Sequence, residues 1–101
     1  MKIRLLSSAF NDLSRGWDFY EQQGAGVGGY FLDSLFSDID SLILYAGIHR
    51  KVFGFHRLLS KRFPHAIYYR METGNEVVVY RVLDCRQDPH KIGVSLKRTH
   101  E

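Results

Sequence analysis

The fold is decided by residues 63–86, which read FPHAIYYRMETGNEVVVYRVLDCR. Two runs rich in β-branched and aromatic residues, Phe63–Glu72 and Glu76–Arg86, flank Thr73-Gly74-Asn75. Glycine and asparagine both tolerate a positive φ, and a Gly-Asn step between two such runs is typical of a tight β-turn. The stretch therefore predicts a β-hairpin.

A two-residue loop at Gly74-Asn75 also predicts the register of this hairpin. It places His65 opposite Asp84, Ile67 opposite Val82, Tyr68 opposite Arg81 and Arg70 opposite Val79. The face with the stronger apolar middle is expected to pack on helices, and it comprises His65, Ile67, Tyr69, Met71, Val78, Tyr80, Val82 and Asp84. The other face comprises Ala66, Tyr68, Arg70, Val77, Val79, Arg81 and Leu83. A slip of one residue would exchange the two faces.

The residues before the hairpin add strands and two helices. Period-two alternation predicts strands over 2–6 and 53–59. Ser7-Ser8 can cap a helix over 8–23, which a glycine cluster at 24–29 ends. A second helix is expected from Val27 or Tyr30 to Ala46. The stripes that we expect to be buried are Phe10, Leu13, Trp17 and Tyr20 on the first helix, and Phe31, Leu35, Ile39, Leu42 and Ala46 on the second.

These elements predict one α+β domain over residues 1–101. It has an N-terminal strand, an α-helical hairpin and then a three-stranded antiparallel meander, with the helices packed on one sheet face. Asp88-Pro89 suits a helix N-cap followed by proline, and Ile92 and Leu96 stand four residues apart. Gly93 weakens this helix, so a final strand through residues 92–96 is the alternative for the tail.

The composition limits the classes of protein that the chain can form. Its 101 residues are 45% hydrophobic, enough for one core without a stabilising metal or disulfide. Cys85 is the single cysteine, which excludes an intramolecular disulfide and a cysteine-based zinc site. No apolar run approaches the ~20 residues that cross a bilayer. We therefore expect a cytoplasmic protein without a cofactor, a metal or a membrane partner.

The formal net charge of +3 at pH 7 is unevenly distributed. Residues 1–48 hold three lysines and arginines against six acidic residues, whereas residues 49–101 hold eleven against five. This division favours an anionic partner for the second half, either a nucleic acid or an acidic protein. A solvated basic surface is the alternative.

The candidate binding residues gather in the predicted meander. An arginine beside a tyrosine on an exposed sheet face suits contacts with phosphates and bases, and cross-strand packing without a ligand is the alternative. His65 is either a structural partner of Asp84 or an acid–base group, and His90 is a candidate general acid or base. The candidates for target or nucleic-acid binding are Arg57, Lys61, Arg62, Tyr68, Arg70, Arg81 and Arg86.

The glycine cluster, Gly24-Ala25-Gly26-Val27-Gly28-Gly29, satisfies the pattern G-x-G-x-x-G. In dinucleotide-binding proteins this loop follows a strand within a βαβ unit. Here it follows a predicted helix. We therefore interpret the cluster as the turn of the helical hairpin.

Several blocks of the sequence resemble the RelE/ParE superfamily of bacterial type II toxin–antitoxin toxins, most closely its ParE-like branch. The blocks are Arg57-Leu58-Leu59, Lys61–Arg70 and Asp84–Pro89, supported by Phe19-Tyr20-Glu21 and the Gly26-Val27-Gly28 turn. The resemblance implies the RelE/ParE-like fold. It also implies a small toxin that a cognate antitoxin binds and neutralises.

The resemblance favours one of two activities. ParE-like members poison DNA gyrase without hydrolytic chemistry of their own, and this is the function that we expect. RelE-like members are endoribonucleases that cleave mRNA with basic strand residues and an aromatic hydroxyl or histidine near the C-terminus. In that alternative, with the ribosome and mRNA as partners, Arg70, Arg81 and Arg86 would stabilise the scissile phosphate and His90 would transfer a proton, since no tyrosine follows Arg86. A non-toxic homologue that only binds antitoxin is the third hypothesis.

Overall fold

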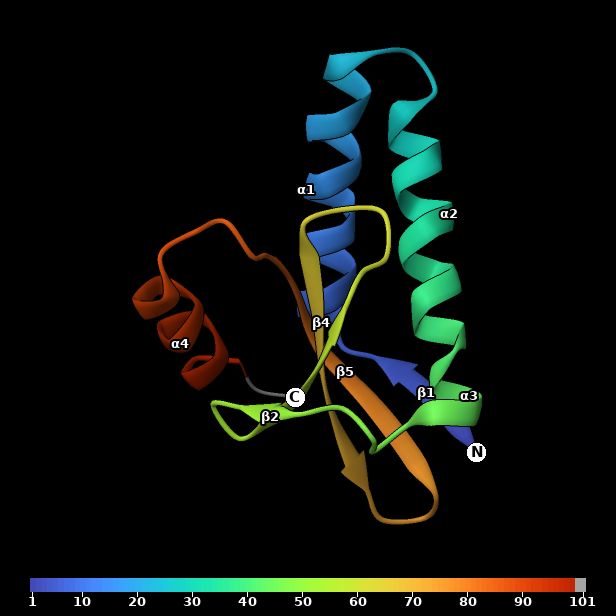
Figure 1. Cartoon of the computed structure of the whole chain (residues 1–101), viewed down its shortest axis with the longest axis vertical. Helices are drawn as coiled ribbons and strands as arrows, with labels where there is room; N and C mark the ends of the chain where they lie inside the picture. The colour runs from blue at the N-terminus through green and yellow to red at the C-terminus, as the bar shows by residue number, and fades with distance from the viewer. Residues whose placement is uncertain (100–101) are drawn as a thin grey trace.

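The computed structural model describes residues 1–99, which form an α+β domain (Figure 1). The elements follow one another as β1 (Lys2–Leu5), α1 (Ser7–Gln23), α2 (Val27–Asp40), α3 (Leu42–Tyr45), β2 (Lys51–Val52), β3 (Phe55–Leu59), β4 (His65–Glu72), β5 (Glu76–Asp84) and α4 (Pro89–Lys97). The predicted order of an N-terminal strand, a helical hairpin and an antiparallel meander is confirmed. The short β2 was not predicted, and the second helix is divided at Ser41 into α2 and α3.

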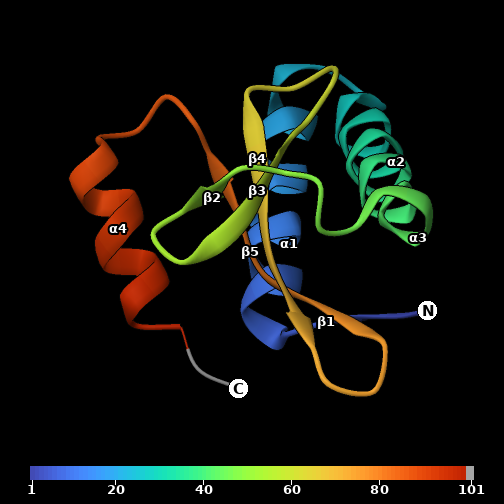
Figure 2. The same ribbon diagram turned by 60° about the horizontal axis from the view of Figure 1, so that its bottom comes forward.

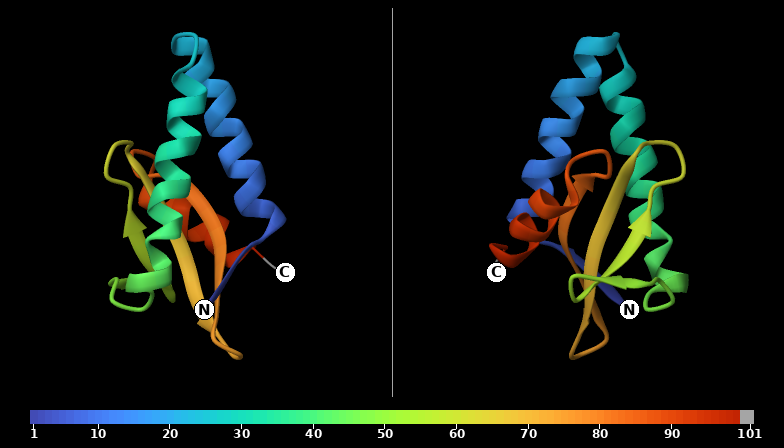
Figure 3. Two further views of the ribbon diagram at one scale, coloured as in Figure 1. Left: turned by 90° about the vertical axis from the view of Figure 1, so that its right-hand side faces the viewer. Right: turned by 60° about the vertical axis from the view of Figure 1, so that its left-hand side comes forward.

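The five strands form one mixed sheet in the order β1-β5-β4-β3-β2. β1 is parallel to β5, and the other neighbours are antiparallel. The α1–α2 hairpin lies against one face and extends beyond the sheet at its turn (Figure 3). The predicted packing of the helical hairpin on one sheet face is therefore confirmed.

The helix-facing core confirms the predicted stripe of the second helix and corrects that of the first. Phe31, Leu35, Ile39 and Leu42 are at most 2% exposed. On α1, however, Ala9, Leu13 and Asp12 are buried, whereas Phe10 is 54% and Trp17 37% exposed. A Cβ on Gly16 would lie 2.4 Å from the Phe31 ring, so the two helices approach each other along the small side chains of α1. Phe10 and Trp17 thus lie outward, whereas Leu13 and Tyr20 of the predicted stripe pack in or against the core.

The second face of the sheet is covered by α4, which lies across the sheet from the hairpin (Figure 2). Its residues Ile92 and Leu96 share an apolar cluster with Ala66, Tyr68, Val78, Tyr80 and Leu83. The Asp88 side chain accepts the His90 N–H at 2.9 Å, which is the predicted N-cap. The helical interpretation of the tail is therefore correct, and the expected exposed sheet face is wrong because Tyr68 is only 1% exposed.

The predicted register of the hairpin holds from His65 to Tyr68 and is wrong from Tyr69 onward. His65 faces Asp84 and Tyr68 faces Arg81, but the register shifts between Tyr68 and Tyr69, so that Arg70 faces Val78 instead of Val79. The loop holds three residues rather than two, because Glu72 pairs with Glu76. As a result, Val77 and Val79 face the helical hairpin, whereas Val78 and Tyr80 face α4.

Donors at the start of α1 bond to the irregular part of β5. Instead of capping the helix, as predicted, the Ser8 hydroxyl donates a hydrogen bond of 2.6 Å to the Tyr80 carbonyl. The Leu6 N–H bonds to the Val79 carbonyl at 3.0 Å. The chain leaving β1 thus supplies donors to the irregular part of β5, which a reading of the hairpin alone does not reveal.

Candidate functional site

Arg81 is held inside the molecule by Asp12 of α1. Its Nε donates to Asp12 Oδ2 at 2.7 Å and its Nη2 to Asp12 Oδ1 at 2.9 Å. Its Nη1 reaches the Ser95 carbonyl at 3.5 Å and the Thr99 hydroxyl at 3.4 Å. The hydrogen bonds that Arg81 donates to Asp12 raise the pKa of Arg81. Arg81 therefore joins α1, β5 and α4, and each of its three guanidinium nitrogens donates to a group of the protein.

The carboxylate of Asp12 is equally occupied. Besides Arg81, it accepts the Val82 N–H and an Arg15 Nη2 donor, each at 2.9 Å. The Asp12 side chain is 4% exposed. The buried stripe that the sequence predicts for the first helix does not include Asp12. No local pattern reveals a partner that lies 69 residues further along the chain.

Arg86 makes a two-pronged ion pair with Asp84. Its Nε and Nη2 donate to the two carboxylate oxygens at 3.0 and 2.7 Å, and these contacts lower the pKa of Asp84. The hydroxyl of Tyr20 lies close to Arg86 but is buried without a hydrogen-bond partner of normal geometry. Burial raises the pKa of Tyr20, and the nearby guanidinium opposes this effect.

His65 is buried among aromatic rings rather than paired with Asp84. Its ring centroid lies 5.0 Å from that of Phe31 and 5.9 Å from that of Tyr20. Its Nδ1 has no hydrogen-bond partner among residues 1–99, and burial lowers its pKa. The predicted register with Asp84 is confirmed, but Asp84 directs both oxygens to Arg86. A neutral packing role for His65 follows.

Arg70 lies on the other side of β4, over a pair of aromatic rings. Its guanidinium carbon is 4.0 Å from the centroid of Phe55 and 5.3 Å from that of Tyr80. Its Nε donates to the Gly54 carbonyl at 3.3 Å. With Lys51, Gly54, His56 and Met71 it lines a cavity of about 220 Å³.

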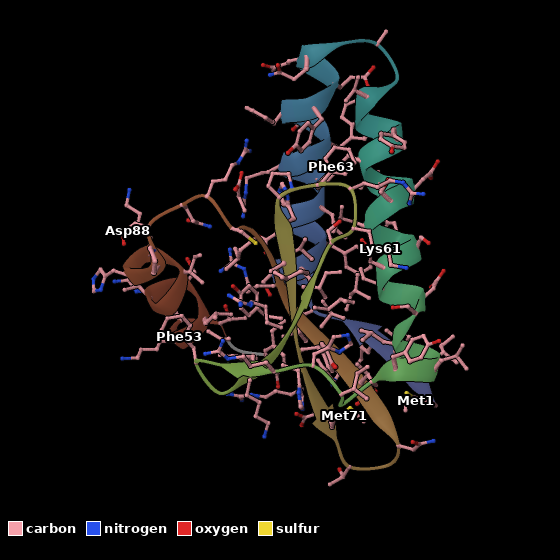
Figure 4. All side chains as sticks on the ribbon, in the orientation of Figure 1. Met1, Phe53, Lys61, Phe63, Met71 and Asp88 are labelled. Carbon is pink, nitrogen blue, oxygen red and sulfur yellow. The ribbon has the colours of Figure 1, made fainter. Side chains whose placement is uncertain are left out.

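The remaining candidates are spread over the surface. Arg57 pairs in register with the buried Tyr68, whose pKa is raised by burial and lowered in part by Arg57. Lys61 and Arg62 are exposed in the β3–β4 loop, where the Lys61 N–H reaches Asp38 at 3.4 Å beside α2 (Figure 4). His90 is exposed on the first turn of α4.

The four residues of the ribonuclease hypothesis do not gather at one cavity. Arg81 lines a cavity of about 320 Å³ between α1, β5 and α4. Arg70 lines the cavity of about 220 Å³ at the β2–β3 turn, and His90 lines a third, of about 250 Å³, with Phe53 and Gly93. Arg86 is held by Asp84 beside the first.

An apolar hollow lies on the outer surface of the helical hairpin. It measures about 510 Å³ and is lined by Phe10, Leu13, Ser14, Trp17, Asp18, Leu32 and Phe36. The signal was present in the helical spacing of Phe10 and Trp17, but that spacing was interpreted as core. Exposed aromatic residues in a hollow are typical of a surface that binds another protein.

The part of the chain that the structure describes offers no ready metal centre. No group of three or more His, Cys, Asp and Glu side chains within residues 1–99 is placed to hold a metal ion. None of the helices in this range is long and apolar enough to cross a membrane.

Comparison with known protein families decides the affiliation of this fold. A family model described as the ParE toxin of the type II toxin–antitoxin system parDE matches residues 3–89. The chain belongs to this family. The match runs from β1 to the first residue of α4, so it includes the whole sheet and the helical hairpin. The resemblance to the ParE-like branch of the RelE/ParE superfamily is thereby confirmed.

A solved structure supports the fold independently. A chain described as "Chromosomal ParDE TA system from P. aeruginosa" superposes with a TM-score of 0.67 at 22% sequence identity, covering 81% of this chain and 92% of that chain. At this identity the likeness concerns the fold. No curated protein sequence matches the chain.

Proposed function

We propose that this toxin-family chain acts in the cytoplasm by binding DNA gyrase and blocking replication, and that a cognate antitoxin neutralises it. The observation that carries the proposal is the match of the ParE toxin family to residues 3–89. The match spans every strand and the whole helical hairpin, which form the scaffold of the molecule.

The arrangement of the basic residues favours binding over hydrolysis. Cleavage of RNA by general acid–base catalysis requires a proton-transfer group within hydrogen-bond reach of a stabilised phosphate. Arg70, Arg81 and His90 line three separate cavities. Arg81 is also fully engaged by Asp12 and α4. A protein that inhibits gyrase by contact alone needs no such cluster.

The antitoxin is proposed to bind as an amphipathic segment. The hollow on the hairpin, with Phe10, Trp17 and Phe36, offers apolar anchor points. The basic second half of the chain attracts acidic residues and speeds their capture. A small neighbouring gene is expected to encode this segment, and copurification of the two products from their natural operon tests the partnership.

Controlled induction in bacterial cells distinguishes the three hypotheses. A gyrase inhibitor should stop growth with DNA damage signalling while protein synthesis continues at first. A ribonuclease should instead stop translation within the same interval and leave cut mRNA. The absence of any growth defect would point to a non-toxic antitoxin-binding homologue. Translation arrest before any DNA damage signal would overturn the gyrase proposal.

A further inference from the structure

The turn between β2 and β3 holds an unfavourable backbone conformation. Val52 pairs with Phe55, so the loop consists of Phe53 and Gly54, whose φ angles are 55° and 81°. A two-residue hairpin with two positive φ angles suits glycine and asparagine, whereas a phenylalanine rarely adopts it. Strained backbone of this kind persists where the surrounding structure enforces it, often at functional sites.

The strained turn fixes two neighbours at once. The Gly54 carbonyl accepts the Arg70 Nε–H at 3.3 Å. On the other side, the Phe53 ring lies beside α4 (Figure 4), where a Cβ on Gly93 would be 3.0 Å from it. The turn therefore clamps α4 and positions the Arg70 guanidinium.

Arg70 is held ready to bind an anion before any ligand arrives. Its guanidinium is stacked over Phe55 at 4.0 Å and fixed at Nε by Gly54. Both terminal amino groups lack a hydrogen-bond partner within residues 1–99. A guanidinium presents these donors as a planar fork that matches the two oxygens of a carboxylate, and restraint before binding lowers the entropy cost.

The charge around Arg70 is not neutralised internally. Arg15 and Arg81 are paired with Asp12, and Arg86 is paired with Asp84. Within residues 1–99, neither Arg70 nor Lys51 has a carboxylate in ion-pair distance. Both side chains line the same cavity of about 220 Å³. An anion that enters this cavity meets two cations.

The walls of the cavity suit a carboxylate side chain better than a nucleic-acid strand. Recognition of single strands relies on aromatic faces that are free to stack on bases. Here Phe55 and Tyr80 are 3% and 7% exposed, and Arg70 itself covers Phe55. Met71 adds an apolar wall that can contact the methylene groups of a glutamate. The His56 ring in the lining is itself stacked on Tyr69, with the ring centroids 5.0 Å apart.

We propose that Arg70 and Lys51 form a receptor for the carboxylate of an aspartate or glutamate in an acidic segment of the antitoxin. This inference rests on the proposed function, since it names how the partner is held. The Arg70 fork binds the two carboxylate oxygens, Lys51 adds charge, and the β2–β3 turn keeps the fork in place.

The test is a titration of the full chain, labelled with ¹⁵N and ¹³C, with an acetylated peptide of alternating glutamate and alanine, ten residues long. A heptathymidylate, whose six phosphodiester charges match the five glutamates and the C-terminal carboxylate of the peptide, and sodium acetate serve as comparison probes at fixed ionic strength. We expect the peptide to shift the Arg70 Nε–Hε and Met71 methyl resonances in a saturable manner. The oligonucleotide should shift basic residues generally, without saturation at Arg70. A saturable shift of the Arg70 resonance by the oligonucleotide, at a lower concentration than the peptide requires, would overturn the proposal.

Matched variants complete the test. Arg70→Lys keeps the charge but removes the fork, and we expect at least tenfold weaker peptide binding. Arg50→Lys alters an exposed arginine outside the cavity and should change binding less than twofold. Because Arg70 packs on Phe55, Lys51→Ala is the second probe, with at least threefold weaker binding expected. Equal peptide affinity of the wild type and Lys51→Ala or Arg70→Lys would contradict the receptor.

The peptide titration and an assay of gyrase inhibition together separate this inference from the proposed target. Peptide binding at Arg70 by a chain that does not affect gyrase would support the receptor and remove only the gyrase proposal. Gyrase inhibition by a chain whose Arg70 resonance ignores the peptide would leave the target standing and overturn the receptor.

Discussion

At the residue scale, long-range polar contacts decide which charged side chains remain available to a partner. Asp12, Asp84 and Glu21 each accept several hydrogen bonds from their own chain. The sequence predicted the basic candidates by position, but it does not show that Arg81 is engaged by Asp12 or that the terminal amino groups of Arg70 have no partner within residues 1–99. The partner of Arg81 is set by the packing of α1 on β5, and this packing leaves no mark in the local pattern.

The Asp12→Asn substitution is expected to destabilise the fold by about 3–5 kcal/mol, because it leaves the buried guanidinium of Arg81 without a carboxylate. Urea unfolding followed by circular dichroism measures the change. Asp18→Asn, on the exposed side of the same helix, is the matched control and should stay within about 0.5 kcal/mol. A loss below about 1 kcal/mol for Asp12→Asn would contradict the assigned network.

The side chain of Glu21 holds the glycine-rich turn in place. Its carboxylate accepts the N–H groups of Gly26 at 3.1 Å and Gly28 at 2.9 Å, at the start of α2. The loop thus binds its own anion, and the predicted role as a hairpin turn is confirmed. Glu21→Ala should cost about 1–2 kcal/mol in the free energy of unfolding, since it removes a charged helix cap. Gln22→Ala, one residue away and exposed, serves as the control, and equal effects of the two would refute the cap.

At the element scale, what could be predicted depended on how many faces an element buries. α2 buries one stripe, so its helical spacing identified Phe31, Leu35 and Ile39 correctly. β5 is covered on both faces, and its run Val77-Val78-Val79-Tyr80 has no polar alternation that could fix its side. The register shift after Tyr68 therefore could not be predicted. α4 was predicted only as one of two alternatives because of Gly93, whose close approach to the Phe53 ring, 3.0 Å from a Cβ placed there, is a tertiary contact.

Docking of α4 on the sheet is expected to depend on Leu96. Leu96 is 2% exposed in the cluster with Tyr68 and Leu83. Leu96→Ala should lower the free energy of unfolding by about 2–4 kcal/mol, because it removes buried apolar volume. Amide hydrogen exchange should then accelerate in α4 first. The exposed Lys97→Ala is the control, and unchanged protection in α4 of the Leu96 variant would contradict the packing.

Two histidines, His49 and His65, are expected to make the stability of the fold depend on pH. Burial lowers the pKa of His65, and burial together with His56 lowers that of His49. The buried Tyr69 hydroxyl accepts the Gly47 N–H at 2.9 Å and contacts His49 Nδ1, an arrangement that fits a neutral His49. Because the unfolded chain binds these protons more readily, stability present above the ordinary histidine pKa of 6.5 is lost as the pH falls below it.

Urea unfolding at pH 7.5, 6.5 and 5.5 should therefore show a falling free energy of unfolding. Each histidine can contribute at most about 1.4 kcal/mol per pH unit. A variant that carries both His49→Gln and His65→Gln should show a flatter dependence, whatever its absolute stability. A wild-type free energy that stays constant across this range would contradict the neutral state of the two rings.

At the scale of the whole molecule, the surface divides into regions with different chemistry. The outer side of the hairpin carries the apolar hollow with Phe10, Trp17 and Phe36. The cavity beside the β2–β3 turn is lined by Lys51 of β2 and Arg70 of β4, two cations without a carboxylate partner within residues 1–99. One partner chain that touched both regions would have to span the sheet, and its affinity would then exceed that of either contact alone.

The central claim is that this member of the ParE toxin family acts on DNA gyrase by binding. The most direct measurement titrates the purified chain, without antitoxin, into a supercoiling reaction that contains gyrase, ATP and relaxed plasmid. The account predicts dose-dependent loss of supercoiling, with linear plasmid released when the samples are treated with detergent and protease. Undiminished supercoiling and no linear plasmid at a large molar excess of the folded chain would contradict it.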